Sequence, residues 1–77
     1  EIIAAIPERW DGAGPRGLKA EETPIAARAI AAAEAFDRAS GGGLARARAT
    51  VRGESGTAFD PVVVDELMHL TRALASA

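Results

Sequence analysis

The sequence predicts an all-α fold, a small bundle of three to four helices with a long Gly/Pro-rich loop at residues 7–22. Two helix starts, Thr23-Pro24 and Asp60-Pro61, pair a capping residue with a proline at the first helical position. An apolar repeat at helical spacing follows the second start. We expect residues 1–77 to form a single domain, and the apolar run before Pro7 to be the tail of a helix, as in a C-terminal fragment of a longer domain.

The composition limits how such a bundle can be stabilised. The chain has no Cys, so neither a disulfide nor a thiolate metal site can hold it together. The hydrophobic fraction is 48%, but much of it is Ala, which buries little area at roughly 25 cal/mol per Å². We therefore expect close helix-on-helix packing and a face completed by a protein partner or by a second copy in a homo-oligomer.

The charge and hydropathy of the chain exclude two classes of partner. Nine Lys and Arg against eleven Asp and Glu give a net charge of −2, which argues against direct binding of nucleic acid. No apolar run approaches the ~18 residues of a membrane span. We expect a cytoplasmic protein without a membrane partner.

The first complete helix is predicted from residue 24 to about Ser40, where three glycines end it. Thr23 is expected to cap it through its hydroxyl, and Glu34 and Arg38 have the order and spacing of an i, i+4 ion pair. One apolar stripe is expected to be buried, formed by Ile25, Ala29, Ala32 and Phe36.

Residues 44–58 are harder to interpret, because Ala and Val alternate with Arg and Thr in a period of two built from helix formers. A short helix is expected there, since a single strand would have no sheet to join. The last helix begins at Asp60-Pro61, with His69 predicted on its exposed side. Its predicted buried stripe comprises Val63, Leu67, Leu70 and Leu74.

The loop contains a literal G-x-G-x-x-G at Gly12, Gly14 and Gly17. A dinucleotide site would need a strand running straight into the first glycine and a helix starting at the last. Here Pro15 removes a backbone N–H from the turn, and the helix starts later. The pattern does not predict a dinucleotide site.

Three ordered words give a more specific resemblance. The loop word is carried by Glu8, Asp11, Gly12, Gly14, Pro15, Gly17 and Leu18. The second is carried by Pro24, Ala27, Arg28, Phe36 and Asp37, and the third by Gly56, Phe59, Asp60 and Pro61. In these words the chain resembles the C-terminal part of the HD-GYP family of HD-superfamily phosphohydrolases. The resemblance implies a metal-dependent phosphodiesterase, a hydrolase that cleaves cyclic di-GMP.

The sequence departs from this family at the metal ligands. Ile6 and Pro7 stand where the family has two metal-binding His, and neither offers a lone pair to a metal. The family Tyr between Gly14 and Pro15 is deleted, and Glu34 replaces a metal-binding Asp. The His-Asp pair of the family would lie before Glu1. We predict no catalytic and no cofactor-binding residue in this chain, with Glu34 as the one candidate metal ligand.

Other polar and aromatic residues have two readings each. Glu34 with Asp37 is either a residual cation site or a solvated pair. Three arginines either meet a phosphate or an acidic partner, or form a solvated face: Arg46, Arg48 and Arg52. Trp10 is either a ligand platform or a plug against the helices.

Two functions remain open. In the first, the chain is a degenerate HD-GYP-like signalling or regulatory module that acts by protein–protein contact, without hydrolysis. In the second, it is the C-terminal half of a metal-dependent cyclic di-GMP phosphodiesterase. Divalent iron or manganese is expected only in the second case, and binding of a cyclic dinucleotide would follow from the resemblance.

Overall fold

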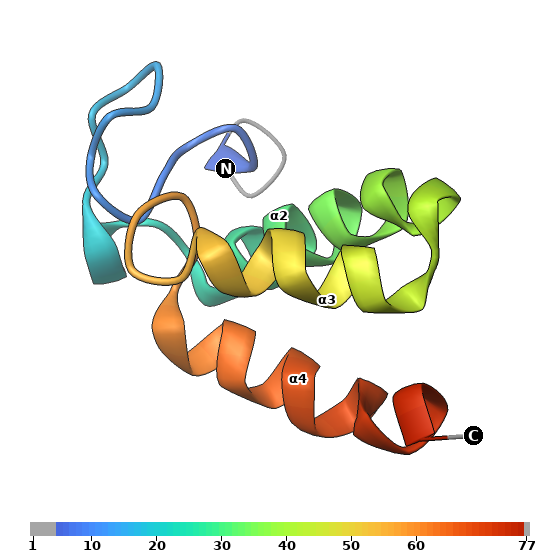
Figure 1. Ribbon diagram of the computed structural model, residues 1–77. Coiled ribbons are helices and arrows are strands. Elements are labelled where there is room, and N and C mark those ends of the chain that lie inside the picture. The colour runs from blue at the N-terminus through green and yellow to red at the C-terminus, as the bar shows by residue number, and fades with distance from the viewer. Residues whose placement is uncertain (1–4, 77) are drawn as a thin grey trace.

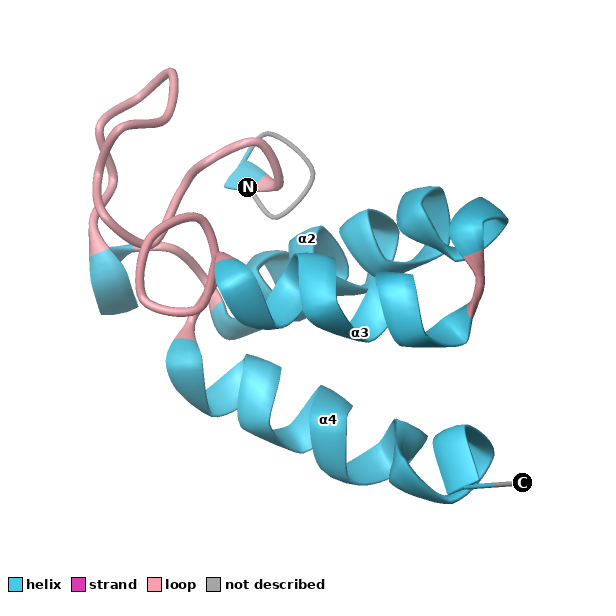
Figure 2. Cartoon of the chain, viewed as in Figure 1, coloured by secondary structure: helices cyan, strands magenta, loops and turns pink. Residues whose placement is uncertain are grey.

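The computed structural model describes residues 5–76, and the fold there is all-α, as predicted. Figure 2 shows helices and loops without strands in this part of the chain. The elements are a 3₁₀ turn at Ala20–Glu22, α2 (Ile25–Ala39), a 3₁₀ turn at Ser40–Gly42, α3 (Leu44–Gly53) and α4 (Pro61–Ser76). Of the predicted helix tail before Pro7, residues 1–4 lie outside the described residues and Ala5 is helical.

The three helices form an up-down-up arrangement (Figure 1). α2 and α3 lie side by side and antiparallel, and they make the most extensive helix–helix packing. α4 runs back along α3, and its C-terminal end diverges from the other two helices. No helix within residues 5–76 is both long and apolar enough to cross a membrane.

The helix ends follow local backbone chemistry, with one correction. α2 and the helix over residues 44–53 are confirmed, and Gly43 separates them with a φ of 100°, a conformation that favours glycine. Asp60 caps α4, since its Oδ1 accepts a hydrogen bond from the Val62 N–H at 2.8 Å. The predicted Thr23 cap is wrong. Pro24 occupies the cap position, and the buried Thr23 hydroxyl has no hydrogen-bond partner among the described residues.

The core lies where the three helices meet and is built from small and medium side chains. Buried Ala35, Val51, Val64 and Met68 form one cluster, and Phe36, Phe59 and Leu67 pack against it. Val51 is the largest side chain that is fully buried among the described residues. Ala27, Ala32 and Ala47 are almost completely covered. Alanine at these positions lets the helices approach closely, as the composition predicts.

The predicted buried face of α4 is right only in its first half, where Val63 and Leu67 are half-buried and Leu67 packs against the core. Leu70 and Leu74 are 69% and 63% exposed, whereas the buried positions are Val64, Met68 and Thr71. The face of α4 that packs on the core is thus shifted from the predicted stripe toward Val64, Met68 and Thr71 and still includes Leu67. Thr71 tolerates burial because its hydroxyl donates to the Leu67 carbonyl at 2.8 Å and accepts from Arg48.

The predicted stripe of α2 is right only in its second half. Ala32 and Phe36 are buried or half-buried, but Ile25 is 58% exposed and Ala29 is exposed as well. The expected Glu34–Arg38 ion pair does not form within the described residues, where both side chains are exposed. Both corrections leave apolar and charged groups of α2 available on the surface.

The loop between Pro7 and Ala20 packs mainly against the α3–α4 connection. The backbone N–H of Trp10 donates to the Ala58 carbonyl at 3.1 Å, and the backbone N–H of Asp11 donates to the Thr57 carbonyl at 2.9 Å. Residues 6–9 face α2 across a hollow, while the remainder of the loop extends beyond the end of the bundle (Figure 1).

Candidate functional site

Arg28 connects the three sequence words to one another. Its Nη1 donates to Asp60 Oδ2 at 2.5 Å, and its Nε donates to the Thr23 carbonyl at 2.9 Å. The guanidinium also lies 5.9 Å from the centre of the Trp10 ring, a cation–π distance. The sequence identified Arg28 and Asp60 as motif residues but not as a pair. The sequence signal was that both residues occur in the family motifs, and membership of a motif does not show that two side chains touch.

Glu8 organises the loop rather than facing solvent. Its side chain is buried, with Oε2 accepting from the Arg16 N–H at 2.7 Å and Oε1 accepting from the Leu18 N–H at 3.2 Å. A Cβ on Gly14 would lie 2.7 Å from the Glu8 Cα, which is backbone and cannot move aside. Glycine at this position is therefore required by close approach.

Asp11, Gly12 and Pro15 belong to the same loop, and Asp11 and Pro15 are exposed. Asp11 Oδ1 accepts from Arg9 Nε at 3.3 Å and from the Ala13 N–H at 3.0 Å. The hydrogen bond from Arg9, then that from Ala13, lowers the pKa of Asp11. The same bond raises the pKa of Arg9. The residues of the loop word thus stabilise the loop itself.

The positions that carry metal ligands in the HD-GYP family converge in space. Ile6, Pro7 and Glu34 line one hollow of about 600 Å³ between the start of the loop and α2. We call it the ligand-position hollow; its charged lining consists of Glu8, Arg9, Glu34, Arg38 and Glu54. The three positions that the resemblance relates to metal ligands thus lie around one hollow, and two arginines that it did not predict line the same hollow.

The donor set of this hollow does not fit a divalent metal. Glu8 is committed to the loop backbone, and Glu54 pairs with Arg9 at 3.8 Å. Glu34 is the remaining carboxylate among the described lining residues, and Arg38 lines the same space. A hydrolytic centre needs several N and O donors on one ion. No cluster of three or more His, Asp or Glu suited to a metal occurs in residues 5–76. Glu34 as a metal ligand remains a prediction.

The other predicted candidates lie apart from this hollow. Arg48 points inward and donates to the Met68 carbonyl at 2.8 Å, so it is a packing residue. His69 is exposed on α4, as predicted, beside a shallow depression that it shares with Arg52 and Arg72. Trp10 is half-buried with Arg28 over its ring, and Asp37 is exposed. Arg46 belongs to α3 and lines a groove between α2 and α3, on the opposite side of α2 from the cleft that faces α4.

Comparison with known proteins gives relatives of one kind. No family model matches the chain. A cyclic di-GMP phosphodiesterase of Thermotoga maritima is 34% identical over 82 residues, covering 96% of this chain and 22% of that protein. A probable cyclic di-GMP phosphodiesterase of Vibrio cholerae is 33% identical over 76 residues, covering 88% and 17%.

One solved structure agrees in fold as well. The crystal structure of a cyclic GMP-AMP specific phosphodiesterase from Vibrio cholerae superposes with a TM-score of 0.89 at 29% identity, over 92% of this chain and 18% of that one. The chain thus spans about a fifth of the length of the proteins it matches. These relatives support the HD-GYP resemblance: over nearly its whole length the chain is homologous to a segment of cyclic di-GMP phosphodiesterases.

Proposed function

We propose that the chain is a degenerate HD-GYP-like signalling module that acts by protein–protein contact and does not hydrolyse a cyclic dinucleotide. The observation that carries the proposal is the ligand-position hollow. Ile6 and Pro7 line it where the family has histidines, and Arg9 and Arg38 bring positive charge to the place of the metal. One free carboxylate, Glu34, cannot replace a set of several donors.

The contact surface that supports this function is a cleft between α2 and α4. This apolar cleft has a volume of about 310 Å³, and Val62 and Leu70 on its rim are 68% and 69% exposed. Covering one such side chain contributes roughly 1.5–3 kcal/mol. The α2 side of the cleft presents the small side chains of Ala29 and Ala33.

A second copy of the chain is the partner that fits this surface. In a two-fold dimer both copies use the same patch, so the patch must contain both a projecting group and the hollow that receives the same group of the other copy. The apolar cleft offers both, with Leu70 as the projection and the alanines of α2 as the hollow.

Sedimentation equilibrium of the 77-residue chain tests this contact. The chain should self-associate, and Leu70→Glu should shift it to monomer while leaving the helical circular dichroism unchanged, because Leu70 is outside the core. His69→Glu places the same charge at an exposed position next to it, outside the apolar cleft, and should associate like the unmodified chain. A strictly monomeric chain without a partner contradicts the proposal.

The alternative is a C-terminal half of a metal-dependent cyclic di-GMP phosphodiesterase. The names of the relatives favour it, as does the retained carboxylate of Glu34 facing the hollow. It predicts that a longer protein carrying this chain purifies with stoichiometric iron or manganese and linearises cyclic di-GMP. A metal-free and inert longer protein eliminates this alternative.

A further inference from the structure

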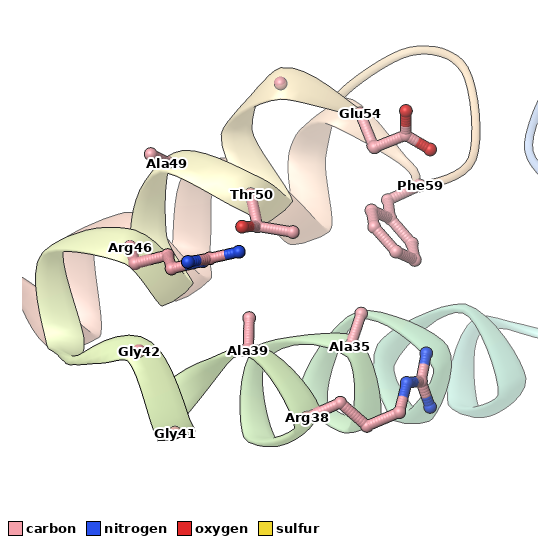
Figure 3. A pocket seen from close by; sticks show the side chains of 11 residues that line it. Ala35, Arg38, Ala39, Gly41, Gly42, Arg46, Ala49, Thr50, Glu54 and Phe59 are labelled. Carbon is pink, nitrogen blue, oxygen red and sulfur yellow. The ribbon is translucent and has the colours of Figure 1, made fainter.

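A groove between α2 and α3 has a volume of about 950 Å³ (Figure 3). Its walls are small side chains, among them Ala35, Ala39 and Ala49, which leave the groove wide. Two arginines line it from opposite helices, Arg38 from α2 with its guanidinium on the side of Phe59, and Arg46 from α3 beside Thr50. We call this hollow the arginine groove.

The exposed Arg46 side chain lines the arginine groove beside Gly42. Figure 3 shows the Arg46 side chain between the two helices, alongside Thr50. A Cβ on Gly42 would lie 2.3 Å from Arg46 Cδ and 3.1 Å from its Nε. A Cβ on the neighbouring Gly41 would have no atom within 4 Å. The side chain therefore occupies the space that a larger residue at position 42 would take.

The arginine groove is locally positive although the chain carries a net charge of −2. The side chains of Arg38, Arg46 and Thr50 make no hydrogen bond or ion pair within the described part of the chain. The acidic residue that lines the groove is Glu54, and it already pairs with Arg9 at 3.8 Å. Two cationic forks and a hydroxyl are thus available to a ligand.

We propose that the arginine groove binds a small molecule that carries a phosphate-type oxyanion. Guanidinium groups form paired, charge-assisted hydrogen bonds with phosphate oxygens, and the Thr50 hydroxyl adds a donor beside Arg46. Phe59 lines the far end and offers an apolar surface to an organic substituent. The site is separate from the apolar cleft, so it does not depend on the proposed dimer.

Titration calorimetry and amide NMR on the 77-residue chain test the site, with inorganic pyrophosphate and phenyl phosphate as probes at physiological ionic strength. Saturable binding should perturb the amides of Gly42 and Thr50. Arg46→Gln should weaken binding about tenfold or more, as expected for loss of a hydrogen bond to a charged group. Tighter binding of phenyl phosphate identifies phosphate esters as the ligand class, and tighter binding of pyrophosphate identifies free diphosphate.

Gly42→Ala is a second variant, because it keeps every charge and displaces the flexible end of the Arg46 side chain. It should weaken binding by less than Arg46→Gln, since the guanidinium is kept. Gly41→Ala and Arg16→Gln are the matched controls, for backbone restriction and for loss of one exposed positive charge, and both should bind within about twofold of the unmodified chain. Absence of saturable binding overturns the proposal. Unchanged binding by Arg46→Gln, or an equal loss with Arg16→Gln, overturns it as well.

Discussion

The Arg28 guanidinium holds together three segments that are distant in the sequence. It bonds the carbonyl before α2 and the cap residue of α4, and it covers the ring of Trp10 in the loop. Asp60 is almost fully buried, so the ion pair with Arg28 compensates the carboxylate for its lost hydration.

Arg28→Lys tests this arrangement at the residue scale. An ammonium cannot reproduce the fork that reaches Thr23 and Asp60 together, so we expect a loss of about 1–3 kcal/mol in the free energy of unfolding, measured with urea. Arg38→Lys is the control, because Arg38 is exposed, and should change stability by less than about 0.5 kcal/mol. Equal effects of the two substitutions would refute the role given to Arg28.

Asp11 provides a pH-dependent test of the loop. Its pKa in the folded chain lies below the ordinary 3.8, chiefly because of the Arg9 hydrogen bond. Its contribution to the loop is therefore present above pH 3.8 and is lost as the pH falls through the lower folded-state pKa. An NMR titration of the Asp11 carboxyl should give a midpoint below 3.8, and Arg9→Gln should raise it. An Asp11 midpoint that is unchanged by Arg9→Gln would contradict the role given to the Arg9 hydrogen bond.

At the scale of elements, Phe36 is the main anchor of α2. It is half-buried against the cluster of Ala35, Val51, Val64 and Met68. Phe36→Ala should lower the free energy of unfolding by about 2–3 kcal/mol, at or below the lower end of the range for buried aromatics. Ile30→Ala on the exposed side of α2 should cost less than about 1 kcal/mol. A loss below about 1 kcal/mol for Phe36→Ala would show that the cluster is not the core.

The helix positions could be predicted from the sequence because their ends depend on local chemistry. Pro24, Gly43 and Asp60 determine their own backbone or cap whatever the rest of the chain does. The buried faces could not be predicted in the same way. Periodicity finds apolar positions, but Ile25 and Leu70 lie on a side where no element of the described chain covers them.

Part of the candidate site could be predicted from the sequence, namely the positions that belong to the family motifs. The resemblance gave Ile6, Pro7 and Glu34 as related positions, and all three line the ligand-position hollow. Arg9 and Arg38 at the same hollow depend on long-range packing of the loop against α2, which no local pattern reports. The arginine groove was not predicted from the sequence, because no local pattern shows that Gly42 and Arg46 lie next to each other in the fold.

On the scale of the whole molecule, α2 has two exposed sides with different chemistry. One side forms the apolar cleft with α4, and the other forms the arginine groove with α3. The ligand-position hollow adjoins the arginine groove, because Arg38, Glu54 and Phe59 line both. The proposed contact surface and the proposed anion site thus lie on different sides of α2.

Manganese binding to the 77-residue chain tests the central claim, that the ligand-position hollow lacks the donors to hold a catalytic ion. The free Mn²⁺ signal in electron paramagnetic resonance can be followed during titration of the unmodified chain and of Glu34→Gln. The account predicts that the two titrations coincide. Uptake of one Mn²⁺ per chain that is lost in Glu34→Gln would contradict it.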